Sequence, residues 1–119
     1  MAKRILVIDD STSMLLALQA GLEKLGYEVT TASSGQSALQ QFSKSRPHLI
    51  ILDIGMPGMD GWEVCRQIRK TSTVPIIFLT GYHLSQEDIR KGLENGCKAY
   101  LIKPVSLEDL QDFMQVILN

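Results

Sequence analysis

Short apolar runs alternate along the chain with longer segments in which apolar residues recur at helical spacing. This alternation is typical of repeated strand–helix units built around a parallel sheet. Three of the runs are almost entirely apolar, as strands are when helices cover both faces of their sheet. We expect five strands, in the ranges Arg4–Ile8, Glu28–Ala32, Leu49–Leu52, Ile76–Leu79 and Ala99–Ile102.

The segments between these runs predict helices and show where they end. Gly26 follows an apolar stripe and suits the C′ position, because glycine readily adopts the left-handed conformation that ends many helices. Four leucines at helical spacing make up this stripe: Leu15, Leu18, Leu22 and Leu25. Ser85 and Ser106 each precede acidic residues, which the helix dipole favours in a first turn, so both serines are predicted N-caps. Gly96 is expected to end the fourth helix.

The length and composition fit a single domain. With 119 residues, 45% of them hydrophobic, the chain can form one compact core, and we expect one domain over residues 1–119. Twelve basic and 13 acidic residues give a net charge of -1, with no basic run suited to a nucleic-acid backbone or an anionic membrane surface. No apolar stretch approaches membrane-spanning length, and Cys65 and Cys97 lack metal-ligand or redox spacing. We therefore expect a cytoplasmic protein with free thiols that binds neither nucleic acid nor membrane.

Acidic, hydroxyl and amine side chains follow the predicted strands at their carboxyl ends. Asp9 and Asp10 follow the first strand, Asp53 the third, Thr80 the fourth and Lys103 the fifth. In an open parallel sheet these ends share one edge, and ligands bind there. Each aspartate alone would be expected to form a turn or cap a helix. Together, the five residues predict a functional site at this edge.

Three carboxylates at one edge predict a bound cation. Two of them about 4 Å apart repel each other by about 4 kcal/mol at an effective dielectric constant of about 20, unless a cation lies between them. Mg²⁺ suits such a site because it takes oxygen ligands and is commonly held by one or two carboxylates plus phosphate oxygens. With Asp53 as the attacking group, the site has the parts needed for phosphoryl transfer to an aspartate. Lys103 supplies a positive charge for the phosphoryl oxygens, and Thr80 supplies a hydroxyl donor.

Four motifs at the strand ends resemble those of one family: Val7-Ile8-Asp9-Asp10, the run from Leu52 to Gly61, Leu79-Thr80-Gly81 and Lys103-Pro104. Along its whole length the sequence is similar to the response-regulator receiver domains of two-component signalling, chemotaxis regulators among them. The resemblance implies a doubly wound, flavodoxin-like α/β fold with five helices around a five-stranded parallel sheet of strand order 2-1-3-4-5. It also implies a signalling phosphoacceptor of a two-component system or phosphorelay, not an enzyme, that assists its own phosphorylation and dephosphorylation.

The resemblance also implies roles for individual residues. Asp53 would accept the phosphoryl group, and Thr80 and Lys103 would hold the phosphoryl oxygens. The Mg²⁺ ligands, some of them bound through water, would be three carboxylates and one backbone carbonyl: those of Asp9, Asp10, Asp53 and Gly55. The Lys103–Pro104 peptide bond is expected to be cis, which costs only about 0.5–1 kcal/mol before proline.

A switch and a set of partners follow from the same resemblance. Tyr100 matches the aromatic switch residue, and we expect its ring to reorient inward when the phosphoryl group draws Thr80 toward it. This would change a protein-binding face formed by the fourth helix, the fifth strand and the fifth helix. The implied partners are a sensor histidine kinase or phosphotransfer protein and a downstream protein. Gly55 and Tyr82 would flank the phosphoryl group and modulate its lifetime.

Two other protein classes share parts of this pattern. An aspartate-nucleophile phosphatase would use similar chemistry, but it is expected to carry a second acid at the position of Gly55. A flavodoxin-like module that binds flavin, or serves as a scaffold, would not need the full set of acids, threonine and lysine. The sequence leaves open whether the chain is a natural single-domain regulator or a part of a longer protein.

The remaining conspicuous residues fit structural roles. His48 and His83 have no partner at metal-ligand spacing, and we expect both at the surface. Gly58 and Gly61 are expected to turn the loop after the third strand, and Trp62 to anchor the third helix by packing.

Overall fold

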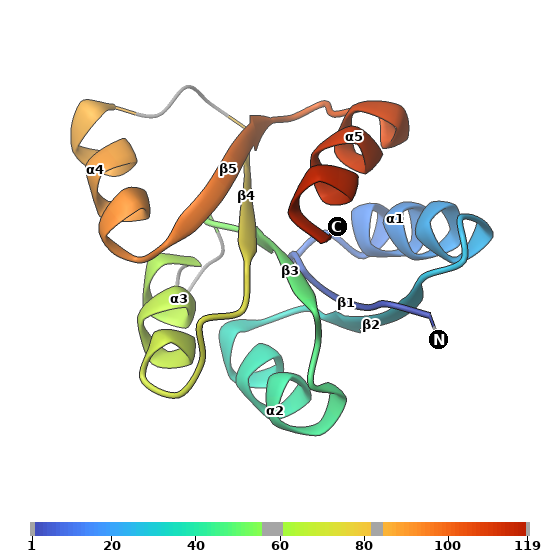
Figure 1. The fold of residues 1–119 in the computed structure, drawn as a ribbon, viewed down its shortest axis with the longest axis horizontal. Coiled ribbons are helices and arrows are strands. Elements are labelled where there is room, and N and C mark those ends of the chain that lie inside the picture. Colours follow the sequence, from blue (N-terminus) through green and yellow to red (C-terminus); the bar gives the residue numbers. More distant parts are fainter. Residues whose placement is uncertain (1, 56–60, 82–84, 119) are drawn as a thin grey trace.

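The computed structural model describes residues 2–55, 61–81 and 85–118 (Figure 1). Its centre is a sheet of five parallel strands in the order β2-β1-β3-β4-β5, which confirms the predicted arrangement. The strands are β1 (Arg4–Ile8), β2 (Glu28–Ala32), β3 (Leu49–Asp53), β4 (Ile76–Thr80) and β5 (Cys97–Ile102). Gly58, Tyr82 and His83 lie outside the described residues.

Three strands extend further than the hydrophobic pattern predicted. β3 ends at Asp53 and β4 at Thr80, one residue beyond each apolar run, and β5 begins two residues early at Cys97. The two residues added at the carboxyl ends pair with neighbouring strands, since Asp53 is in register with Leu79 and Thr80 with Ile102. Strand pairing uses main-chain groups, so a polar residue can continue a strand after the apolar pattern has ended. Two predicted site residues therefore belong to the sheet itself.

Five helices surround the sheet (Figure 1): α1 (Thr12–Lys24), α2 (Gly35–Ser45), α3 (Gly61–Arg69), α4 (Gln86–Glu94) and α5 (Leu107–Leu118). α1 and α5 pack on one face of the sheet, and α2 and α3 on the other, so each face has its own apolar cluster. In the second cluster Trp62 packs on Phe78 with ring centroids 4.8 Å apart, as expected of an anchor. α4 contacts β5 at the edge of the sheet and buries only Gly92. Within the described residues, no helix is both long enough and apolar enough to cross a membrane.

Most predicted helix ends agree with the structure. Gly26 and Gly96 follow α1 and α4 with φ values of 96° and 74°, in the left-handed region that favours glycine. The Ser85 hydroxyl accepts a hydrogen bond from the Asp88 N–H at 3.1 Å, and the Ser85 N–H donates to the Asp88 carboxylate at 3.3 Å. The prediction that Leu25 belongs to the apolar stripe of the first helix was wrong, because this side chain is 40% exposed. This residue is the C-cap that follows the last turn of α1, so it lies outside the buried helical stripe.

A guanidinium group ties the C-terminal end of α4 to α3. Arg69, the last residue of α3, donates hydrogen bonds to the carbonyl oxygens of Asn95 and Gly96. It also donates to the carbonyl oxygen of Ser72 at 3.3 Å. The last carbonyls of a helix have no partner within the helix, and an arginine from another element can bind them. No local sequence pattern predicted this contact, because α3 and α4 meet only in the folded chain.

Candidate functional site

Three carboxylates meet at the carboxyl edge of the sheet. Asp9 and Asp10 follow β1, and Asp53 is the last residue of β3. One carboxylate oxygen from each lies within 4.8 Å of the others. Asp9 and Asp53 are buried, at 1% and 6% exposure, whereas Asp10 is exposed. The structure thus brings together the three acids that the sequence placed at one edge, and their oxygen atoms form a group that could hold a metal ion.

Backbone groups orient the two buried carboxylates. The Ser11 N–H donates to Asp9 Oδ1 at 3.0 Å, and the Gly55 N–H donates to Asp53 Oδ1 at 3.0 Å. Ser11 is also the N-cap of α1, where its hydroxyl accepts from the Met14 N–H at 3.3 Å. The role of Ser11 was missed in the sequence, although a serine before a predicted helix is a recognisable N-cap. The Oδ2 atoms of Asp9 and Asp53 both lie near the ammonium group of Lys103.

Lys103 reaches into this group of acids from the end of β5. Its Nζ donates to Asp9 Oδ2 at 2.8 Å and lies 3.6 Å from Asp53 Oδ2. Its backbone N–H donates to the Thr80 carbonyl oxygen at 2.7 Å, which fixes the main chain beside β4. The Lys103–Pro104 peptide bond is cis, as predicted. A single residue therefore links the sheet edge, two carboxylates and the start of the segment that leads to α5.

The charges in this site shift the pKa values of Asp53 and Lys103. Burial, and then the negative charges of Asp9 and Asp10, raise the pKa of Asp53 above its ordinary value, against the opposing effects of the Gly55 N–H and Lys103. For Lys103, burial is the largest single influence and would lower the pKa. The hydrogen bond to Asp9 and the charges of Asp9 and Asp53 together outweigh it, so the pKa of Lys103 is raised. Negative charge at this edge is therefore only partly offset by the ammonium group.

The predicted switch residues lie on two adjacent strands. Thr80, at the end of β4, is 1% exposed, and it is in register with Ile102 of β5. Tyr100 lies on β5, an edge strand, and is 39% exposed. Its neighbours Ala99 and Leu101 pack into the apolar cluster beside α1 and α5. Because successive side chains alternate between the faces of a strand, Tyr100 lies on the opposite face, on the side of α4.

Two glycines after Asp53 differ in the space around them. At Gly55, which is exposed, a Cβ atom would lie 3.7 Å from Asp53 Oδ1, an ordinary van der Waals contact. At Gly61, a Cβ atom would lie 2.4 Å from the Cα of Ile54 and 2.7 Å from the carbonyl oxygen of Asp53. The sequence predicted only a turn at Gly61. The structure shows that this position needs glycine because the backbone of α3 approaches the end of β3 closely.

The sequence of the chain is similar to those of known proteins along nearly its whole length. A family model described as the response regulator receiver domain matches residues 5–115. The chain is 41% identical, over 98% of its length, to the probable transcriptional regulator ycf27 of Cyanophora paradoxa. It is also 41% identical, over 100% of its length, to the alkaline phosphatase synthesis transcriptional regulatory protein PhoP of Bacillus subtilis. It covers 48% and 50% of these two proteins, so the chain spans about half the length of the curated relatives it matches.

Solved structures match the chain over nearly its full length. The chemotaxis protein CheY4 of Vibrio cholerae is 35% identical with a TM-score of 0.93, and the match covers 99% of this chain and 100% of that one. A CheY-like response regulator receiver domain protein from Methanospirillum hungatei JF-1 is 33% identical with a TM-score of 0.92, over 99% and 94% of the two chains. The five-stranded fold and the arrangement of its helices are thus shared with both proteins.

Proposed function

Because this chain belongs to the response regulator receiver domain family, it is a signalling phosphoacceptor domain of two-component systems, and we propose that Asp53 is the residue that is phosphorylated. The observation that carries this proposal is the position of Lys103 Nζ, 2.8 Å from Asp9 Oδ2 and 3.6 Å from Asp53 Oδ2, within a group of three carboxylates. The charges of Asp9, Asp10 and Lys103 all act on the pKa of Asp53, so its carboxylate lies close to the other charged groups of the site.

The three acids are proposed to hold Mg²⁺, with the backbone carbonyl of Gly55 as a further ligand. Their donor atoms are all oxygens within 4.8 Å of one another, which suits a hard cation such as Mg²⁺. The raised pKa of Asp53, caused by burial and by the charges of Asp9 and Asp10, supports the fit, because a cation at this place would relieve the repulsion. When bound, Mg²⁺ would neutralise charge on the phosphoryl oxygens and on the acceptor.

In the proposed reaction, a carboxylate oxygen of Asp53 attacks the phosphorus atom of a phosphohistidine. The new O–P bond forms an acyl phosphate as the N–P bond of the donor breaks and the imidazole leaves. Oδ1 accepts the Gly55 N–H at 3.0 Å, so Oδ2, which faces Lys103, is the oxygen better placed to attack. Lys103 would then bind a phosphoryl oxygen, and the Thr80 hydroxyl would donate to another. The donor would be a sensor histidine kinase or a phosphotransfer protein in the cytoplasm.

The same group of residues is proposed to control output and signal lifetime. Movement of Thr80 toward the phosphoryl group would let the exposed Tyr100 ring turn inward, which would change the surface formed by α4, β5 and α5. A downstream protein would bind that surface, without direct contact of this chain with nucleic acid. Hydrolysis of the acyl phosphate would be assisted by the site itself, at a rate that depends on the side chains at Gly55 and Tyr82.

Mass spectrometry after incubation with acetyl phosphate and Mg²⁺ tests the proposal. We expect addition of one phosphoryl group to the unmutated protein, none to Asp53→Asn, and none to the unmutated protein in EDTA. Asp112→Asn is the matched control, because it makes the same change at an exposed acid on α5 and should leave labelling unchanged. Labelling of Asp53→Asn to the same extent as the unmutated protein would contradict the assignment.

A further inference from the structure

An asparagine followed by a glycine makes up the whole connection between α4 and β5 (Figure 1). Asn95 is the C-cap of α4, and Gly96 has a φ of 74°. The sequence contains two asparagines, Asn95 and Asn119, and only Asn95 precedes a glycine. Asparagine is chemically labile, and a following glycine hinders attack on its side chain least because glycine has no Cβ atom. The dipeptide Asn95–Gly96 is therefore the place in this chain with the greatest tendency to deamidate.

Deamidation at this place needs only groups of the chain and water. The Gly96 nitrogen gives up its proton and attacks the side-chain carbon Cγ of Asn95. A C–N bond forms, the bond from Cγ to Nδ2 breaks, and the amide nitrogen takes up a proton and leaves as ammonia, so that a cyclic succinimide results. Water then adds to one of the two ring carbonyls and opens the ring. The product is aspartate or isoaspartate, with one water consumed and one ammonia released.

The fold holds both reacting groups in hydrogen bonds. The Gly96 N–H donates to the carbonyl oxygen of Leu93 at 3.1 Å. The side-chain Nδ2 of Asn95 donates to the carbonyl oxygen of Lys91 at 2.8 Å. The Gly96 nitrogen must break the first bond before it can lose its proton and turn to Cγ, and the amide must break the second before it can leave. Both acceptors are carbonyls at the C-terminal end of α4, so this end of the helix must open before the reaction begins.

Side chains of α3 hold the main chain of the same turn. Arg69 donates to the carbonyl oxygens of Asn95 and Gly96, and the Cys65 thiol donates to that of Asn95 at 3.7 Å. A Cβ atom at Gly96 would lie 3.1 Å from Arg69 Nε, so the guanidinium group lies directly against the glycine. Gly96 is exposed, so water reaches the turn, and the reaction is limited by local opening of the turn.

We propose that Asn95–Gly96 is a deamidation site and that Arg69 sets its rate by keeping the turn closed. In isoaspartate the main chain runs through the former side chain and is one carbon longer between α4 and β5. The carbonyl groups that Arg69 binds are then displaced from the guanidinium group, and the modification releases the C-terminal end of α4 from α3. The inference is independent of phosphorylation, because no residue of the carboxylate site takes part in the reaction.

Peptide mapping by mass spectrometry tests the site. The protein is incubated in warm, mildly alkaline buffer without Mg²⁺ or acetyl phosphate and is then digested with trypsin, which releases residues 92–98 as one peptide. We expect this peptide to show the mass change of amide-to-acid conversion, with isoaspartate detected by an isoaspartate methyltransferase. The conversion should be more than about tenfold slower in folded protein than in protein unfolded in urea. Absence of conversion in urea, or equal rates in the two states, would overturn the proposal.

Variants on α3 test the role of Arg69. Arg69→Ala should raise the conversion rate in folded protein about tenfold, as expected for the loss of hydrogen bonds from a charged donor. Arg69→Lys keeps the charge without the planar fork of donors and should give a smaller rise. Arg66→Ala is the matched control, because Arg66 is exposed on the same helix and pairs with Glu63. A rate in Arg69→Ala no higher than that in Arg66→Ala would overturn the role of Arg69.

Hydrogen exchange separates opening of this turn from loss of the whole fold. The Gly96 N–H should exchange faster in Arg69→Ala than in the unmutated protein, whereas the N–H of Ile51, in the fully buried β3, should stay protected. If Arg69→Ala is unfolded, Arg69→Lys takes its place in this comparison. Faster deamidation without faster exchange at Gly96 would overturn control by the turn. Asn95→Gln should abolish conversion of the peptide, and conversion that persists in this variant would overturn the assignment to Asn95.

Discussion

The side chains of Lys103 and Asp9, 94 positions apart in the sequence, form an ion pair in which Nζ donates to Oδ2 at 2.8 Å. Asp9 is 1% exposed, so its charge has little contact with water and depends on bonding partners within the protein. A divalent ion held by the same carboxylates would act on the same negative charge. We therefore expect the lysine and a bound metal ion to be partly interchangeable for the stability of the fold.

Replacing Lys103 with methionine removes the charge and keeps a flexible side chain of similar length. In EDTA, Lys103→Met should lower the free energy of unfolding by about 1–3 kcal/mol, less than the roughly 3–5 kcal/mol for a fully buried pair, because Lys103 is partly exposed. Saturating Mg²⁺ should restore part of this loss. Urea unfolding with and without Mg²⁺ measures both effects. Lys70→Met, at an exposed position of the α3–β4 connection, is the control. If Mg²⁺ leaves the stability loss of Lys103→Met unchanged, Lys103 and a metal ion do not share this stabilising role.

Asp53→Asn should stabilise the metal-free protein at neutral pH by on the order of 1 kcal/mol, a fraction of the repulsion of a bare like-charge pair. Burial and the charges of Asp9 and Asp10 raise the pKa of folded Asp53 above the ordinary 3.8, so its ionised form lowers the stability of the fold. That cost is complete above the folded pKa, shrinks as the pH falls through it, and is absent below about 3.8.

The measurement is urea unfolding of both proteins in EDTA at several pH values. The stability difference between Asp53→Asn and the unmutated protein should be largest near neutral pH and should narrow toward acid. Asp112→Asn, an exposed acid on α5, should change stability by less than about 0.5 kcal/mol at any pH. A destabilised Asp53→Asn at neutral pH would mean that the carboxylate is favourably bonded in the metal-free fold.

Mg²⁺ should stabilise the unmutated protein through linkage, because the proposed site of three carboxylates is assembled only in the folded state. At a free concentration of about 100 times the Kd, the gain is about 2.7 kcal/mol for one site. Thermal unfolding across a Mg²⁺ titration measures it, with Asp53→Asn as the comparison, in which one ligand is lost and most of the gain should disappear. K⁺ at matched ionic strength controls for screening, and an equal gain with K⁺ would exclude a specific site.

Gly61→Ala should destabilise the protein by about 1–3 kcal/mol or more, because the added methyl group meets backbone atoms that cannot move aside. Its Cβ would lie 2.4 Å from the Cα of Ile54 and 2.7 Å from the carbonyl oxygen of Asp53. Gly81→Ala is the matched control, since no atom of the described residues lies within 4 Å of a Cβ there. Urea unfolding compares the two variants. Equal stability of both would show that α3 can shift away from β3 at little cost.

The fold was predictable because three of its strands are marked by almost entirely apolar runs. Ile50, Ile51 and Leu52 are all fully buried in β3, and the parallel order of the sheet agrees with the prediction. The strand ends were less predictable, since main-chain pairing carries β3 on to Asp53 and β4 on to Thr80 after the apolar pattern has stopped. The convergence of the site residues followed from topology alone, because parallel strands place their carboxyl ends at one edge.

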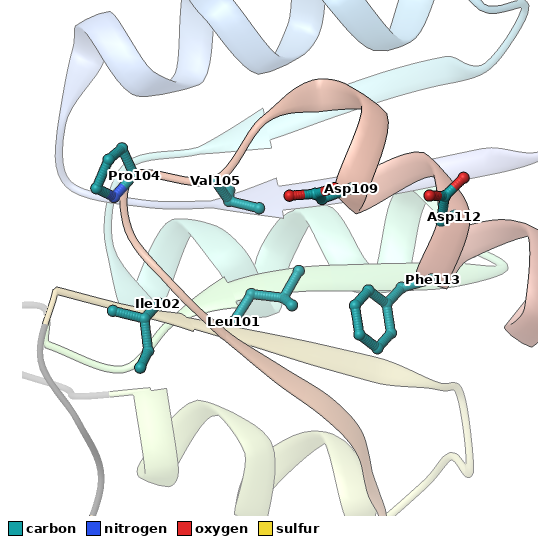
Figure 2. A pocket seen from close by; sticks show the side chains of 7 residues that line it. All are labelled: Leu101, Ile102, Pro104, Val105, Asp109, Asp112 and Phe113. Atoms are coloured by element: carbon teal, nitrogen blue, oxygen red, sulfur yellow. The ribbon is translucent and has the colours of Figure 1, made fainter.

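Contacts between distant segments could not be predicted from local pattern. His48 was expected at the surface, yet it is half-buried, and its Nδ1 accepts the Arg4 N–H at 2.9 Å across 44 positions of sequence. The bonds of Arg69 to the carbonyls of Asn95 and Gly96 are of the same kind. A groove between β5 and α5, lined by Phe113 and Leu101 among other residues, was also missed, because its shape depends on how these two side chains are placed relative to each other (Figure 2). Periodicity identifies which face of a helix or strand is buried, but it does not predict the hydrogen bonds and hollows that form between neighbouring elements.

The two ends of α4 are held in different ways. At its C-terminal end the carbonyls of Asn95 and Gly96 accept hydrogen bonds from Arg69 of α3, whereas at its N-terminal end Ser85 and Asp88 bond to each other in the capping box. The bonds at the C-terminal end thus join α4 to another helix, whereas those of the capping box lie within α4 and its N-cap. A change in the angle between α3 and α4 would therefore disturb the bonds of Arg69 and leave those of the capping box intact.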